Sequence, residues 1–262
     1  MRRTNRVTRF SVIPIFILVT TLIPFSITAQ TKIKQKSVQS VSLSPVNTQE
    51  MIELFSTLNT PDFPTWLDSN TLLAPDLQSS DEQFARATWL AQLHIVQDQA
   101  ACDRLHQQAA SVLKLFHRQH TIRFFIYLDD YPNIQTIAGS YLAASTGLIQ
   151  LLKRDSPDNS QLNGLVAHEL ARTIHQNQFV EAWKHEDFQT VRSFELFYDA
   201  VATSALNHLW LQSEQYALVL ERMTRNTTGR ETDPIRHPTL DQRQSLIRTI
   251  THAQRSAVIA IK

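Results

Sequence analysis

The sequence predicts a mainly α-helical protein with a small β-sheet, an α+β fold. Ala, Leu and Gln, which favour helices, are abundant, and apolar residues recur at helical spacing through much of the chain. Only two stretches are typical of strands: residues 121–130 (TIRFFIYLDD), which are rich in β-branched and aromatic residues, and residues 140–145 (SYLAAS). With 262 residues, 42% of them apolar, the chain is long enough for one large domain with a substantial core.

The N-terminus has the pattern of a secretory signal. Four arginines and no acids precede an apolar run of about twenty residues, and Ala29 supplies a small residue before a cleavage point. The alternative is an uncleaved anchor, because the run is just long enough to span a membrane, although Pro14 and Pro24 interrupt it. We therefore expect a signal peptide or anchor over 1–29, and an exported protein in the periplasm or cell envelope.

The remaining chain divides into a polar tether over 30–48 and a single domain over 49–262. The expected elements of that domain, in order, are a helix at 49–58, a proline-containing loop at 60–80, one long or two consecutive helices at 81–119, the two strands, a helix from 146, helices at about 160–178, 188–211 and 213–224, a loop, and a last helix from 239. Thr239 and Gln242 form a capping pattern at the start of the last helix. Cys102 lies among alanines in a helical pattern, which indicates a buried structural thiol.

Composition and motifs exclude several classes of function. The formal net charge is +1, and it falls to −3 once four arginines and no acids are removed with the signal, so no nucleic-acid partner is expected. Only four glycines stand against ten prolines, and no glycine-rich nucleotide loop is present. Membrane contact is expected only through an uncleaved N-terminal segment.

One short motif carries metal chemistry. His168 and Glu169 begin the zinc-protease signature HExxH, in which two histidines one helical turn apart bind the metal and the glutamate polarises a metal-bound water. The position of the second histidine holds Arg172. Farther along, Glu195 and Asp199 share a helix face, so that Glu195 could bind a metal while Asp199 orients His168.

Four segments in order and spacing resemble the family M-forty-eight metallopeptidases, of the HtpX-like and CaaX prenyl protease type. These segments are PNIQTIAGSYLAASTGLIQLL, LNGLVAHELARTIH, FELFYDAVA and RHPTLDQR, and the resemblance covers roughly residues 81–255. It implies a gluzincin-like metallopeptidase fold, with helices around a zinc site and a small sheet whose edge strand holds a polypeptide substrate.

The resemblance also implies roles for individual residues. His168 is similar to the first zinc ligand, Glu169 to the general base and Glu195 to the third ligand. The further positions that it implies are Asp199 behind the histidine, His237 near the metal, and Asn133, Ser140 and Tyr141 at the substrate strand.

Arg172 departs from the family pattern, because a guanidinium has no lone pair to offer a metal. Two hypotheses follow. In the first, Arg172 replaces the zinc ion among the carboxylates, and the protein binds polypeptides without cleaving them. In the second, the protein is a zinc endopeptidase of the cell envelope that uses His168, Glu195 and His237 as ligands.

Overall fold

The computed structural model describes residues 48–58, 62–71, 88, 91–137, 139–153, 159–226 and 237–260. All of them belong to one compact unit, Leu43–Lys262. The expected signal segment and all of the tether except Thr48 lie outside the described residues. Within the described ranges, no helix combines the length and the apolar character that a membrane span requires.

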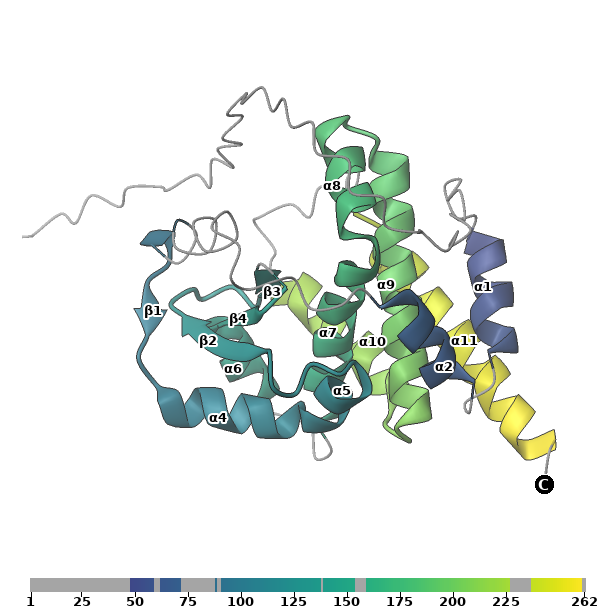
Figure 1. The fold of residues 1–262 in the computed structure, drawn as a ribbon, viewed down its shortest axis with the longest axis horizontal. Coiled ribbons are helices and arrows are strands. Elements are labelled where there is room, and N and C mark those ends of the chain that lie inside the picture. The colour runs from purple at the N-terminus through teal and green to yellow at the C-terminus, as the bar shows by residue number, and fades with distance from the viewer. Residues whose placement is uncertain are drawn as a thin grey trace, which may run out of the picture. The chain divides into compact units, whose positions relative to one another are not determined.

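The described chain is mainly helical and contains one small sheet, as predicted (Figure 1). The helices are α1 (Thr48–Thr57), α2 (Phe63–Asn70), α4 (Gln99–Gln108), α5 (Ala110–Leu115), α6 (Thr146–Leu152), α7 (Ser160–Ala171), α8 (Gln176–Lys184), α9 (Phe188–His208), α10 (Ser213–Asn226) and α11 (Leu240–Ala260), with a 3₁₀ turn η1 (Arg172–His175) between α7 and α8. The strands are β1 (Ile95–Val96), β2 (Arg123–Tyr127), β3 (Ile134–Ile137) and β4 (Tyr141–Ser145).

The four strands form a mixed sheet in the order β1-β2-β4-β3. Strand β4 lies inside the sheet, parallel to β2 and antiparallel to β3, and all five of its residues are buried. Strand β3 is therefore an edge strand of the described sheet, and it packs beside α7. Helix α4 packs against β2 (Figure 1).

Helices α7 and α9 form the centre of the core. All twelve residues of α7 are buried, and α9 is buried from Phe194 to Leu206. Helices α10, α11 and α1 pack around this pair. A helix that is buried on every side is usually apolar throughout, so the polar residues that α7 and α9 carry in their middle need specific partners.

The start of the last helix follows the predicted capping pattern. The Thr239 backbone N–H donates to Gln242 Oε1 at 2.9 Å, and the Gln242 backbone N–H donates to Thr239 Oγ1 at 3.2 Å. The free thiol of Cys102 is buried, as predicted.

Three predicted elements were wrong in detail. The expected loop over 60–80 contains α2, because Pro64 stands in the first helical turn, where proline removes no needed N–H donor. The expected helix over 81–119 contains β1, which gains its hydrogen bonds from β2, a distant partner that local spacing does not reveal. The expected helix over 160–178 changes to a 3₁₀ turn at Arg172, and α8 then continues to Lys184.

Candidate functional site

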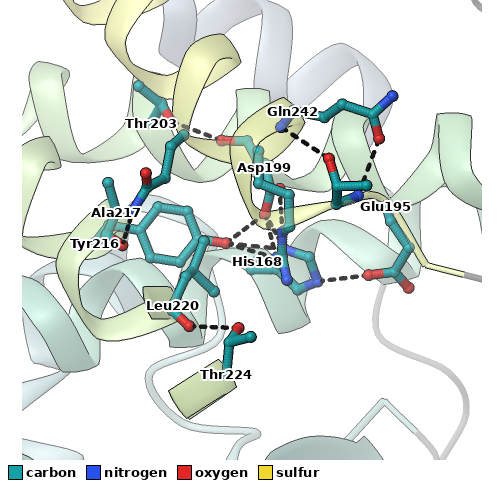
Figure 2. A network of polar contacts seen from close by, with 12 residues as sticks. His168, Glu195, Asp199, Thr203, Tyr216, Ala217, Leu220, Thr224 and Gln242 are labelled. Atoms are coloured by element: carbon teal, nitrogen blue, oxygen red, sulfur yellow. Dashed lines mark hydrogen bonds and ion pairs between the residues drawn. The ribbon is translucent and has the colours of Figure 1, made fainter. Parts of the chain in front are cut away.

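The polar residues of the central helices meet in one buried network (Figure 2). His168 on α7 directs its Nδ1 atom at Asp199 Oδ1 on α9, at 2.8 Å. The Tyr216 hydroxyl from α10 donates to the same carboxylate oxygen at 2.5 Å and lies 3.1 Å from His168 Nδ1. All three side chains are buried, so these contacts replace the water that each group would otherwise bind.

A fourth helix supplies the charge that balances Asp199. Arg243 on α11 donates from Nε to Asp199 Oδ2 and from Nη2 to Asp199 Oδ1, each at 2.6 Å. Burial alone would raise the pKa of Asp199, but the adjacent Arg243 charge and hydrogen bonds outweigh burial and lower this pKa to about 2. The two hydrogen bonds from the Arg243 guanidinium thus keep Asp199 ionised and orient its carboxylate toward His168.

Gly164 lets α10 approach α7 closely enough for this network to form. A Cβ atom at residue 164 would lie 2.5 Å from Cδ2 of the Tyr216 ring. Glycine in a helix interior is destabilising by roughly 0.5–1 kcal/mol relative to alanine. Its presence in α7 is explained by the position of the tyrosine.

Arg172 contacts the carboxylate that the family resemblance assigns to a metal. Its Nη2 atom donates to Glu195 Oε1 at 2.5 Å, and its Nε atom lies 3.7 Å from Glu169 Oε1. The guanidinium carbon lies 5.6 Å from the centre of the Phe179 ring, within the range of a cation–π contact. Burial opposes ionisation of Glu195, but the Arg172 charge and the His168 hydrogen bond dominate, and the pKa of Glu195 lies well below its usual range.

The carboxylate of Glu169, the expected general base, is bound by the edge strand. It accepts hydrogen bonds at Oε2 from the Thr136 backbone N–H at 2.8 Å and from the Thr136 hydroxyl at 3.1 Å. The same hydroxyl lies 3.0 Å from the Glu169 backbone carbonyl. Glu169 therefore holds β3 against α7, rather than presenting a free carboxylate.

The residues expected at the substrate strand are divided between the starts of two different strands. Asn133 precedes edge strand β3, and its side-chain amide donates to the Tyr127 hydroxyl at 2.9 Å. Ser140 precedes the interior strand β4 and Tyr141 begins it, and both are buried. The prediction grouped all three with one strand, whereas a turn at 139–140 separates β3 from β4.

Two of the expected zinc ligands keep a suitable spacing. His168 Nε2 and Glu195 Oε2 are 3.4 Å apart. Two ligands with bonds of ~2.0–2.1 Å at a tetrahedral angle lie about 3.3 Å apart, so this pair retains the geometry of a ligand pair.

The remaining donors do not complete a zinc site. His237 is exposed, whereas His168 and Glu195 are buried, so the ligand set of the second hypothesis is not assembled. The position one turn after His168 holds the Arg172 guanidinium, which binds Glu195 Oε1 itself. Across the described ranges, no group of three or more His, Cys, Asp and Glu side chains is placed to hold a metal ion.

The carboxylates on both sides of His168 favour its protonated form when no metal is bound. Burial disfavours the imidazolium, but the hydrogen bonds to Asp199 and Glu195 outweigh burial and raise the pKa of His168. A histidine that binds zinc must be neutral and must direct a lone pair at the metal. Here both ring nitrogens face carboxylate oxygens, an arrangement that favours the doubly protonated ring.

Sequence reasoning missed three residues of the site: Thr136, Tyr216 and Arg243. Arg243 lies within the RHPTLDQR segment that carries part of the resemblance, and its place in that segment is a signal that could have identified it. Thr136 and Tyr216 show no local signal, because each meets its partner only through the packing of distant elements.

Comparisons with protein-family models and with curated proteins gave no match to this chain.

Proposed function

We propose that this protein is a non-catalytic relative of zinc metallopeptidases in which the Arg172 guanidinium takes the place of the metal ion. One observation carries the proposal: Arg172 donates to Glu195 at 2.5 Å, from the position that a second zinc-binding histidine would occupy. One fixed cation among ionised carboxylates meets the electrostatic demand that a metal would otherwise meet.

The state of Glu169 supports the same proposal. A general base must reach a water molecule, and this carboxylate instead accepts two hydrogen bonds from Thr136. Hydrolysis would need the strand to release Glu169, in addition to a metal that the described side chains do not assemble.

We infer that the protein binds polypeptides through edge strand β3. The Asn133 carbonyl accepts from the Ser145 backbone N–H and so faces β4, while the Thr136 N–H points the other way, toward Glu169. By the alternation of a strand, the backbone groups of Ile134 share the outward edge with Thr136. The Thr136 N–H already donates to Glu169, so an added strand would pair with the backbone groups of Ile134 and with the Thr136 carbonyl. The arginine-rich start and apolar run of the sequence support a location of this activity in the cell envelope.

Metal content and polypeptide binding test the two parts separately. The mature chain, purified without chelators, is expected to contain far less than one zinc per molecule by elemental analysis. Fluorescein-labelled casein, a weakly structured polypeptide, should show a saturable rise in anisotropy with the protein and no cleavage on a gel.

Stoichiometric zinc, or cleavage of casein that a chelator abolishes, would contradict the proposal and favour the endopeptidase hypothesis. The Glu169→Gln variant is the control for such cleavage, because it removes the expected general base with little change in side-chain volume. Absence of any anisotropy change would refute polypeptide binding and leave the metal replacement standing.

A further inference from the structure

A pocket lies apart from the polar network. It has a volume of about 410 Å³ and is lined from the β1–α4 region, β2, α6 and the start of α7, and none of the network residues lines it. Small-molecule pockets typically measure ~300–1,000 Å³. At on the order of 20–30 Å³ for each non-hydrogen atom, the pocket is large enough for a ligand of about 14 to 20 such atoms.

The floor of this pocket is apolar. Leu105, Ile126 and Leu162 are buried side chains that line it, and the half-buried Ile149 and Leu152 of α6 add to the same lining. The floor combines side chains from a strand and three helices, which hold it in a fixed shape. An apolar ligand body would gain here from the removal of water from both surfaces.

The rim is cationic and rich in amides. Arg104 on α4 and Lys153 after α6 line the pocket, are exposed, and make no ion pair with any residue whose position the structure describes. Asp98 is the acidic residue of the lining, and its Oδ1 atom already accepts the Ala101 backbone N–H at 2.9 Å as the cap of α4. Asn159, also in the lining, makes no capping hydrogen bond with its side chain.

We propose that this pocket binds a small organic acid, with its carboxylate at Arg104 and Lys153 and an apolar body, such as a medium-length acyl chain, on the floor. The two cations line one pocket from different elements, and neither side chain has a hydrogen bond to another residue within the described ranges. The apolar floor disfavours a fully polar anion, because such a ligand would leave the side chains of Ile126 and Leu162 in contact with water. This inference does not depend on the proposed function.

Decanoate is a suitable probe, measured by isothermal titration calorimetry on the full chain at low ionic strength. Acetate carries the same charge without the chain, and decyltrimethylammonium carries the same chain with the opposite charge. Saturable binding of decanoate at one site is expected, with both control ligands at least roughly tenfold weaker. Equal binding of decyltrimethylammonium, or absence of decanoate binding, would overturn the proposal.

Variants locate the binding in the pocket. The double substitution Arg104→Gln and Lys153→Gln should weaken decanoate binding roughly tenfold, since two exposed charge interactions are lost. The matched control is Lys114→Gln with Arg123→Gln, which removes an exposed lysine and an exposed arginine outside the pocket lining. Unchanged affinity in the pocket variant, or an equal loss in the control, would refute the assignment.

A third variant tests the floor independently of charge. Ile149→Trp places a large ring in the pocket from a half-buried position and should abolish decanoate binding. Retention of full affinity would overturn the proposal. If Ile149→Trp fails to fold, the double variant Arg104→Gln and Lys153→Gln and its matched control test the proposal by themselves.

Discussion

Replacing Arg172 with alanine should destabilise the protein strongly. Its guanidinium bonds Glu195 at 2.5 Å and lies 3.7 Å from Glu169, and these carboxylate side chains are only 4% and 6% exposed. Breaking a buried ion pair typically costs ~3–5 kcal/mol, because one charge is left without its partner. Since the Arg172 side chain is itself 32% exposed, we expect the lower end, about 3 kcal/mol.

The loss of stability caused by Arg172→Ala should be smaller at acid pH than at neutral pH. The pKa of Glu195 is held well below its ordinary value of 4.5, chiefly by the charge of Arg172 acting against burial. A group with a lowered pKa in the folded state contributes stability above its unfolded pKa, and that contribution is lost as the pH falls toward the folded value. The difference between Arg172→Ala and the unmodified protein should therefore be full at pH 7 and should shrink below about pH 4.5, where the unpaired carboxylate takes a proton.

Thermal melts followed by circular dichroism at pH 7 and pH 4 measure this difference. About 3 kcal/mol corresponds to a fall in Tm of roughly 6–12 °C for a domain of this size. Arg225→Ala is the matched control, because Arg225 pairs with Glu221 on an exposed helix surface, where a pair contributes ~0–1 kcal/mol. A Tm for Arg172→Ala that equals that of Arg225→Ala, or a difference that grows at acid pH, would refute the reasoning.

Three further substitutions have predicted outcomes. Asp199→Asn should lower the free energy of unfolding by roughly 2 kcal/mol at pH 7. The pKa of Asp199 is about 2, below the ordinary 3.8, and each pKa unit corresponds to about 1.36 kcal/mol. In urea titrations this difference should vanish as the pH falls from about 4 toward 2, where Asp199 itself takes a proton. Gly164→Ala should destabilise by ~1–3 kcal/mol in the same assay, because the new Cβ would lie 2.5 Å from the buried ring of Tyr216; a stabilising effect would show that the ring moves freely. Trp210→Gly should raise the Tm by a few degrees, on the order of 1 kcal/mol, because Trp210 ends α9 with φ 57° and is 77% exposed; a lowered Tm would indicate a packing role for the indole.

The parts of the fold that follow from local pattern were predicted well. The extent of α9 and α10 follows from apolar spacing, and the start of α11 follows from the Thr239–Gln242 pair, whose hydrogen bonds lie within four residues of each other. Strand β2 was visible because its β-branched and aromatic side chains favour an extended chain wherever it packs.

The parts that depend on distant partners could not be read from the sequence. Strand β1 has two residues and exists because β2 lies beside it. The resemblance grouped His168, Glu195 and Asp199, but the hydrogen bonds from Thr136 to Glu169 depend on where β3 docks. The sequence predicted that Arg172 would lie among the carboxylates, whereas the packing of α7 against α9 determines that Glu195 accepts its hydrogen bond.

Substitution of Arg172 with histidine should create a zinc site, because the other parts of one are held in place without metal. Arg243 and Tyr216 fix Asp199, Asp199 fixes the His168 ring, and His168 Nε2 stays 3.4 Å from Glu195 Oε2, close to the separation of two tetrahedral ligands. Without metal, Arg172→His should be destabilised much as Arg172→Ala is, because the guanidinium is lost in both. With zinc at about a hundred times its Kd, Arg172→His should gain about 2.7 kcal/mol, seen as a rise in Tm of roughly 5–11 °C. The unmodified protein and Arg172→Ala should show no such rise, and a chelator should reverse it. If zinc leaves the Tm of Arg172→His unchanged, the 3₁₀ turn places residue 172 too far from His168 and Glu195 to share a metal with them. The Arg172 guanidinium would then contact Glu195 from a position where no metal could be bound.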